Sequence, residues 1–413
     1  MKKLLGHRFR ADWGTARLRR AAVVLVASTM ILTACSNSGD KADEKESEKA
    51  GDFHVVLVVP RTGPLAVQTE AMEHAWSASA DAVNASGGIN GRQVKLEFLD
   101  NAGDPTKAVS VLQKRLSSGP KPDVVMPGGS SNEALAMVPI LVQNKILAFG
   151  ANITPDLNNP EKYPSYFSAY PTTASVAASA AKNLQDAGFQ KVALITSAEA
   201  MGDSVRQATE DAIKEAGMEV TGSETYKLDA LDVTSQLQRL RDTKPDVLFV
   251  QAYGAPAGYV VNGLDKIGWD VPVVGDPSVA ASNLPGLVDE SQLKNIQFLV
   301  FQVQKRIPES EQSEAFKTML NGIKGYGDIK LSLQVYTLLY DVLQVIQTAA
   351  NQAGTTEHDA LVKALENLEQ PAEPTWVTYS TYVYDDTNHM ANPDTSGFSL
   401  VPAGPTVDGM IGD

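Results

Sequence analysis

From residue 53 onward, short apolar runs alternate with longer stretches in which apolar side chains recur at helical spacing. The apolar runs have the length and β-rich composition of strands, and they lie at 53–59, 92–100, 123–126 and 146–150. Between the first two runs, Met72, Trp76 and Ala80 fall on one helical face. Strands that alternate with helices predict a parallel sheet with right-handed crossovers.

A second series of the same kind begins near Thr172. Its strands are expected at 191–196, 218–226, 246–250 and 271–275, and its helices at 173–187, 202–216, 233–242 and 255–267. A strand at 295–303 and helical patterns at 328–350 and 357–368 are then expected to return the chain to the first series. Several crossings between two bodies would make a hinge rather than a rigid joint.

The predicted fold class is therefore α/β, with two Rossmann-like lobes built on parallel sheets. A chain of 413 residues is long enough for two separate cores. We expect the first lobe to contain 53–171 plus about 301–372, and the second to contain 172–300 plus about 373–413.

The N-terminus has the pattern of an export signal. A basic segment precedes the apolar run Ala21–Leu32, which is shorter than the ~20 residues that a membrane-spanning helix needs. The run ends at Leu32-Thr33-Ala34-Cys35 and resembles a bacterial lipobox, in which the cysteine is lipidated and begins the mature chain. The alternative is an ordinary secretory signal beside a chance cysteine. We expect a signal peptide at 1–34 and a lipid anchor at Cys35 on the outer face of the cell membrane.

The composition of the exported chain excludes some structural features and some partners. Residues 35–52 are polar and charged, as expected of a disordered tether. Cys35 is the only cysteine, so the domain beyond it contains no disulfide. The formal charge is −14, and removing 1–34 takes away seven basic residues and one acidic residue, which leaves −20. Nucleic acid is not an expected partner, because binding it requires clustered Lys and Arg.

The residues of a catalytic site are missing from the sequence. The stretch Gly128-Gly129-Ser130-Ser131-Asn132 lacks the last glycine of a nucleophile elbow. None of the histidines forms a metal-ligand pair, and no phosphate-binding glycine motif opens a helix; the histidines of the exported chain are His54, His74, His358 and His389. We therefore expect no enzyme activity, no cofactor and no metal.

Polar groups follow three of the strands predicted in the first lobe. The junctions after the first, third and fourth strands carry Arg61-Thr62-Gly63, Ser130-Ser131 and Ala151-Asn152-Ile153-Thr154. Ligands of parallel α/β sheets bind beyond the carboxyl ends of strands, where helix N-termini favour anions. Alternatively, Ser131 and Thr154 simply cap helices. Because all three junctions converge on one sheet edge, together they favour a binding cleft.

Several segments resemble a known family. These are TGPLA (62–66), NASGGINGRQVKLEFLDNAGDPTKAV (84–109), the paired serines followed by PIL, and DVLFVQAYG (246–254). They resemble the type I solute-binding proteins of ABC transporters, and most closely the branched-chain amino-acid receptors. The resemblance implies two α/β lobes joined by three crossovers that close on a small ligand. It also implies a lipid-anchored monomer that delivers the ligand to ABC permease subunits.

The resemblance assigns site residues on both lobes. In the first lobe it places Ser131, beside Ser130, and Ile153 at the ligand carboxylate, with only a backbone N–H surviving at Ile153 and Thr154 next to it. Ala151, with Asn152 beside it, would offer a carbonyl to the ligand ammonium, and Gln68 replaces a first-loop aromatic. The second-lobe positions are Met201 in place of a tyrosine, the retained Tyr253, and Asp276 as the nearest acidic group.

These replacements bear on specificity. Exchange of tyrosine for methionine removes a hydroxyl and leaves a flexible apolar surface. Two readings remain open. Either the ligand is a larger, more apolar carboxylate or amide, or Thr154 and Asp276 take over the family roles for an amino acid. A sensor that passes closure to a membrane signalling protein is the alternative to a transport receptor.

Overall fold

The computed structural model describes residues 51–62, 66–151, 154–227, 230–392 and 395–412. The predicted signal peptide, Cys35 and almost all of the predicted tether lie outside these residues, as do Gly63, Asn152 and Ile153. None of the helices within the described ranges is long and apolar enough to cross a membrane.

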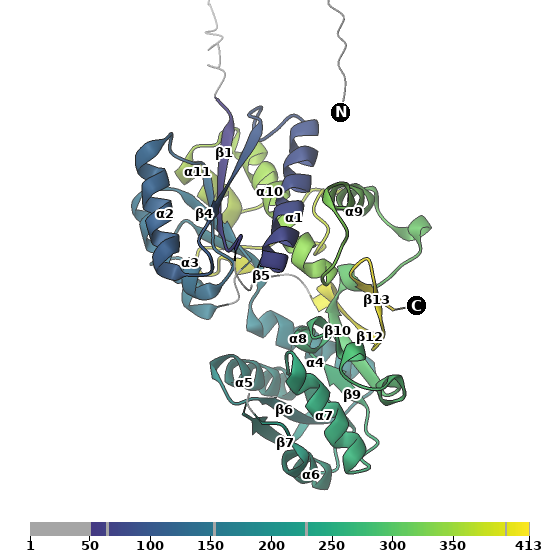
Figure 1. The fold of residues 1–413 in the computed structure, drawn as a ribbon. Coiled ribbons are helices and arrows are strands. Elements are labelled where there is room, and N and C mark those ends of the chain that lie inside the picture. The colour runs from purple at the N-terminus through teal and green to yellow at the C-terminus, as the bar shows by residue number, and fades with distance from the viewer. Residues whose placement is uncertain (1–50, 63–65, 152–153, 228–229, 393–394, 413) are drawn as a thin grey trace, which may run out of the picture. The chain divides into compact units, whose positions relative to one another are not determined.

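The first sheet has the strand order β11-β5-β4-β3-β1-β2, and its strands pair in parallel. The strands are β1 (Phe53–Val59), β2 (Val94–Asp100), β3 (Val124–Pro127), β4 (Leu147–Gly150), β5 (Tyr166–Pro171) and β11 (Met390–Ala391). The helices that connect the first four strands are α1 (Ala66–Ala85), α2 (Pro105–Ser118) and α3 (Ser131–Gln143). α2 and α3 lie on one side of β1 and α1 lies on the other (Figure 1). Alternate residues of β1 face opposite sides, so Val56 and Val58 pack with α2 and α3 while Val55 and Leu57 pack with α1.

The second sheet repeats this arrangement, with the order β12-β10-β9-β8-β6-β7. Its strands are β6 (Lys191–Ser197), β7 (Glu219–Tyr226), β8 (Val247–Val250), β9 (Val273–Gly275), β10 (Ile296–Phe301) and β12 (Phe398–Pro402). Its helices are α4 (Thr173–Asp186), α5 (Ala200–Glu215), α6 (Thr234–Asp242), α7 (Ala255–Lys266) and α8 (Pro277–Ala281). Only β12 runs antiparallel among the described strands of this sheet. The expected fold of two mainly parallel α/β lobes is confirmed.

The chain passes between the two sheets three times, after β5, after β10 and after β11. The long helices after β10 are α9 (Glu314–Tyr326), α10 (Leu333–Ala353) and α11 (His358–Glu366). α10 packs against α1 and α11 and is buried along most of its length, so it belongs to the core of the first lobe. The remaining elements are the hairpin β13 (Thr406–Val407) and β14 (Met410–Ile411), and single 3₁₀ turns at Pro155–Leu157, Leu284–Gly286, Glu290–Leu293, Gln302–Gln304, Glu309–Glu311 and Thr395–Gly397.

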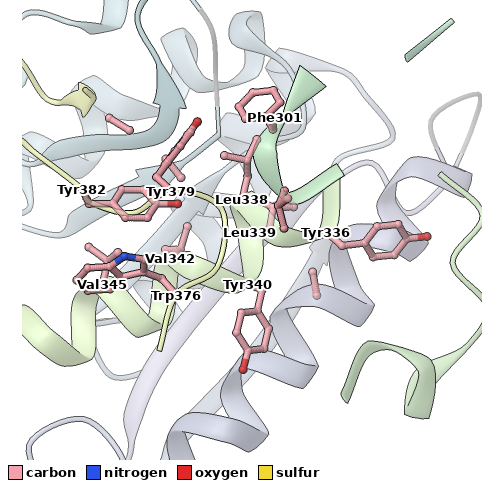
Figure 2. Close-up of a cluster of buried hydrophobic side chains, with 14 of the residues drawn as sticks. Phe301, Tyr336, Leu338, Leu339, Tyr340, Val342, Val345, Trp376, Tyr379 and Tyr382 are labelled. Atoms are coloured by element: carbon pink, nitrogen blue, oxygen red, sulfur yellow. The ribbon is translucent and has the colours of Figure 1, made fainter. Parts of the chain in front are cut away.

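A buried carboxylate ties the last crossing segment to α10. Asp341 accepts hydrogen bonds from the backbone N–H groups of Val377 and Thr378 and from the Tyr382 hydroxyl, each at 2.8 Å. Burial raises the pKa of Asp341 to about 6. Figure 2 shows Trp376, Tyr379 and Tyr382 of this segment beside Leu338, Val342 and Val345 of α10.

These contacts correct part of the predicted lobe division. Residues from about 373 onward were expected in the second lobe, but Met390–Ala391 pairs with β5 of the first sheet. The chain joins the second sheet only at β12. The buried Asp341 carboxylate needs donors and obtains them from Val377, Thr378 and Tyr382, and this pairing helps to hold the segment on the first lobe.

Residues 84–109, the longest of the segments that carry the family resemblance, have a structural role in the first lobe. Gly88 has a φ of +80°, and a Cβ there would lie 2.1 Å from the Arg92 carbonyl oxygen, so no other residue fits. Arg92 forms a bidentate salt bridge with Asp123, in which its two terminal guanidinium nitrogens donate to the two carboxylate oxygens at 2.6 and 2.8 Å. The guanidinium group also lies over the Phe53 ring. These residues fix the turn before β2 and the start of β1 and β3.

Candidate ligand-binding site

Three junctions of the first lobe meet at one sheet edge. β4, β3 and β1 are adjacent and parallel, so the segments after them emerge side by side at their carboxyl ends. Ala151 follows β4, Ser130 and Ser131 follow β3, and Gln68 lies in the first turn of the helix after β1. The predicted convergence of these junctions agrees with the sheet order.

The loop between β3 and α3 is held by a residue that sequence reasoning missed. Glu133 is fully buried, and its Oε2 accepts hydrogen bonds from the N–H groups of Gly129 at 2.7 Å and Ser130 at 3.1 Å. Ser130 completes a capping box by accepting from the Glu133 N–H at 3.4 Å. Gly128 has a φ of +89°, and a Cβ there would lie 2.5 Å from the Glu133 Cβ. The signal was present, since Ser130-x-x-Glu133 is the sequence pattern of a capping box.

This arrangement separates the two serines. The cap of α3 is Ser130, so the alternative in which Ser131 caps the helix is wrong. Ser131 is the first residue of α3 and half-buried, and its hydroxyl has no hydrogen-bond partner among the described residues. Ser131 is therefore the serine whose hydroxyl is available to a ligand.

Some of the other first-lobe side chains remain available to a ligand, and others already form hydrogen bonds or ion pairs within the protein. Thr154 is half-buried and precedes a 3₁₀ turn without a capping hydrogen bond from its side chain. Ala151 and Gln68 are also half-buried. Arg61 instead pairs with Glu73, with 2.6 Å between Nε and Oε1, and the Thr62 hydroxyl donates to Asp100 at 2.9 Å.

The second lobe presents the matching positions. Met201, Tyr253 and Asp276 follow β6, β8 and β9, which are the counterparts of β1, β3 and β4 in sheet order. These residues line one cavity of about 250 Å³. Its polar lining residues are Tyr170, Thr173, Thr209, Gln251, Tyr253, Asp276, Ser278 and Gln334. The cavity thus brings together the second-lobe residues proposed from the sequence, whereas Gln68, Ser130, Ser131, Ala151 and Thr154 do not line it.

One carboxylate oxygen of Asp276 accepts hydrogen bonds within the protein, and the other is available to a ligand. Oδ1 caps α8 by accepting from the N–H groups of Ser278 and Val279 at 3.0 and 3.2 Å, and it also accepts from the Ser278 hydroxyl. Oδ2 accepts no hydrogen bond from any described residue. Burial raises the pKa of Asp276 to about 7. The pKa of Tyr170 is also raised, by burial and then by the nearby Asp276 carboxylate. The cavity therefore contains a carboxylate suited to pair with a cationic or N–H group.

Gln334 was not anticipated from the sequence. It lies in the first turn of α10, is buried, and is the one residue lining the cavity that comes from a helix of the first lobe. Its Oε1 has no hydrogen-bond partner within the described part of the chain. By contrast, Gln251 is engaged, since its Oε1 accepts from the Ser197 N–H and hydroxyl at 2.9 and 3.0 Å. A glutamine at the start of an apolar helix carries no local signal of a site.

Comparison with known proteins places these features in a family. The family model described as periplasmic binding protein matches residues 53–396. The Leu/Ile/Val-binding protein homolog 3 of Brucella melitensis is 22% identical over 352 residues, covering 83% of this chain and 89% of the relative. The Leu/Ile/Val-binding protein of Escherichia coli is 25% identical over 310 residues, covering 74% and 80%.

Solved structures show the same fold. The branched-chain amino acid transporter substrate binding protein LivJ of Streptococcus pneumoniae, in complex with isoleucine, superposes with a TM-score of 0.62 at 19% identity, covering 85% of this chain and all of the other. A putative branched-chain amino acid ABC transporter protein of Rhodospirillum rubrum gives a TM-score of 0.66 at 18% identity, covering 82% and 99%. The chain therefore belongs to the periplasmic binding protein family, as a type I member related to the Leu/Ile/Val-binding proteins.

Proposed function

We propose that this protein is an extracytoplasmic receptor that captures a small ligand between its two lobes. The observation that carries the proposal is the pair of matched sites at corresponding strand ends, one with an available donor and one with an available acceptor. The Ser131 hydroxyl can donate to a ligand carboxylate, and Asp276 Oδ2 can accept from a ligand ammonium. An α-amino acid or a related amine-bearing carboxylate or amide offers both groups, in keeping with the names of the relatives.

Delivery to an ABC permease is the proposed consequence of capture. A ligand that contacts both lobes favours the closed form, because only that form provides both sets of contacts. The family consists of binding proteins, and nothing in the arrangement of the described residues provides a nucleophile with its base. The proposed anchor at Cys35 would keep the receptor at the membrane surface beside the permease.

A ligand screen tests the proposal directly. Melting temperatures of the purified protein are measured with amino acids, amides, ureas and aromatic acids, because a ligand bound only by the folded state raises the melting temperature. We expect at least one amine-bearing carboxylate or amide to do so. A screen in which no such compound shifts the melting temperature would contradict the proposed ligand class.

Ser131→Ala is expected to weaken binding of the best ligand from that screen by about 1–3 kcal/mol, the cost of leaving a buried ligand oxygen without its donor. Calorimetric titration measures the change. Ser118→Ala, on the exposed end of α2, is the matched control and should bind as the parent does. Equal affinities of the Ser131→Ala and Ser118→Ala variants would remove Ser131 from the site.

Cys35→Ala is expected to move the protein from the membrane fraction to the soluble fraction, because the acyl chains on Cys35 would supply the membrane affinity. Immunoblotting of fractionated cells measures the distribution. Ser38→Ala, three residues further on, serves as the control and should stay with the membrane. Membrane retention of the Cys35→Ala variant would mean that the anchor lies elsewhere.

A further inference from the structure

The cavity at Asp276 continues between α4 and α5, away from the strand ends. Met201, Val205 and Thr209 line it at steps of four residues along α5, which is about 12 Å of helix at 1.5 Å per residue. Val176, Ala177 and Ala180 line it from α4, and Phe249 of β8 faces the same side of the sheet. Below its polar end, the cavity is therefore a narrow slot with mostly apolar walls.

The matching helix interface of the first lobe is packed with larger side chains in its described residues. There α1 packs against α10 as α5 packs against α4. That interface contains the fully buried Trp76, and the Ser79 hydroxyl donates to the Tyr340 carbonyl across it. Figure 2 shows the large side chains that α10 contributes, among them Tyr336, Leu338, Leu339 and Tyr340. In the second lobe, α4 and α5 line the cavity with alanine, valine and threonine and a single methionine, Met201, and none of these is aromatic, so the same topology leaves space between the helices.

Two acceptor oxygens near the polar end of the slot receive no hydrogen bond from the described residues. Gln334 is 8% exposed, and its Oε1 has no partner among the described residues. Asp276 Oδ2 likewise accepts from none of them. Gln334 Oε1 is itself covered by protein atoms, whereas Asp276 lines the cavity, so a ligand that supplies an N–H group at this end can pair with Asp276 Oδ2.

The geometry points to a ligand with an amine at Asp276 and an extended apolar side chain, longer than that of leucine, in the slot between α4 and α5. The inference rests on the proposed function and specifies its ligand class. The cavity volume of about 250 Å³ supports it, since an apolar protein cavity of about 150 Å³ already holds benzene. The length of the slot favours a linear side chain over a compact branched one.

The test is a homologous series of straight-chain L-2-amino acids, from alanine through norvaline and norleucine to 2-aminooctanoic and 2-aminodecanoic acid. Calorimetry on the purified protein should show affinity rising about fourfold with each added methylene, the gain from burying one such group. The rise should continue past norleucine and stop when the slot is full. Affinities that level off or fall by norleucine would overturn the inference.

Variants with larger side chains in the slot test whether the apolar side chain of the ligand binds there. Ala180→Leu should remove the gain beyond norvaline while leaving the affinity for alanine nearly unchanged. Ala178→Leu makes the same change on the exposed face of α4 and should bind the whole series as the parent does. Val205→Phe, at a half-buried position on α5, provides a second filled variant if Ala180→Leu fails to fold. A full gain for 2-aminooctanoic acid in a folded, filled variant would overturn the inference.

The series also separates this inference from the proposed function. If alanine and norvaline bind but longer homologues bind no better, the receptor function stands and the slot assignment fails. If no member of the series binds, while a compound without an amine raises the melting temperature, both the amino-acid form of the proposed function and this inference fail.

Discussion

Asp276→Asn is expected to weaken binding of an amine-bearing ligand by about 2–5 kcal/mol, because it removes the charge that faces the ligand cation in a buried site. Asparagine keeps an Oδ1 acceptor, so the N–H groups of Ser278 and Val279 can still donate to residue 276 and α8 stays capped. Calorimetry at pH 8 measures the loss. Asp265→Asn, on the exposed side of α7, removes the same charge from the same lobe and should bind normally.

The same carboxylate makes binding depend on pH. The pKa of Asp276 in the ligand-free protein is about 7, so ionisation costs free energy below that pH. Affinity for a cationic ligand should therefore be constant above pH 8 and fall up to about tenfold per unit below pH 7. Asp276→Asn should abolish this slope. A slope that persists in the Asn variant would assign the titration to another group.

Stability of the ligand-free protein should change in the opposite direction. The folded-state pKa of Asp276 is raised above the unfolded value of about 3.9, so between these values the folded state holds a proton that the unfolded state has lost. Stability falls as pH rises from about 4 to about 7 and then stays level. Asp276→Asn escapes this loss and should be more stable than the parent above pH 7, by up to roughly 4 kcal/mol. Urea denaturation at pH 4 and pH 8 measures the difference.

Asp341→Ala is expected to lower the free energy of unfolding by about 3–5 kcal/mol. The substitution leaves the buried N–H groups of Val377 and Thr378 and the Tyr382 hydroxyl without their acceptor, and it opens a cavity beside α10. Urea denaturation of the ligand-free protein measures the loss. If the two lobes unfold in separate transitions, the shift should fall on that of the first lobe.

Asp211→Ala, at an exposed position of α5, is the control for Asp341→Ala and should change stability by less than about 0.5 kcal/mol. A similarly small loss for Asp341→Ala would mean that residues 376–384 are held by their apolar contacts alone. Trp376, Tyr379 and Tyr382 would then carry the attachment.

Local patterns predicted most of the strands and helices but missed several, the 13-residue helix α9 among them. The run 53–59 forms a strand with the predicted bounds, because its apolar residues are buried on both faces of a parallel sheet. β5, β11 and β12 were not anticipated. β11 has only two residues, and both it and β12 pair with strands far away in sequence, such as Ser168 for Met390. Periodicity within a short segment cannot indicate such a partner.

The sequence likewise predicted some residues of the candidate site and missed others. The first-lobe positions after strand ends followed from topology, since parallel strands bring their carboxyl ends to one edge. Met201, Tyr253 and Asp276 followed from the family resemblance, and they line one cavity. Ser130 caps α3 and leaves the Ser131 hydroxyl available because the buried Glu133 forms a capping box with Ser130. The spacing Ser130-x-x-Glu133 in the sequence already indicated this capping box. Gln334 and the small residues of α4 and α5 had no local signal, because their role depends on what packs opposite them.

The sequence by itself determined the order of strands and helices, the family and the strand ends at which a ligand would bind, because these depend on periodicity, turn residues and motifs that are local in the chain. Only the tertiary structure decided which oxygens at those ends lack partners and how much space lies behind them. Asp276 Oδ2, Gln334 Oε1 and the slot between α4 and α5 result from contacts between segments far apart in sequence. Ligand specificity depends on such contacts, since an unpaired acceptor and an unfilled volume exist only once the chain has packed around them.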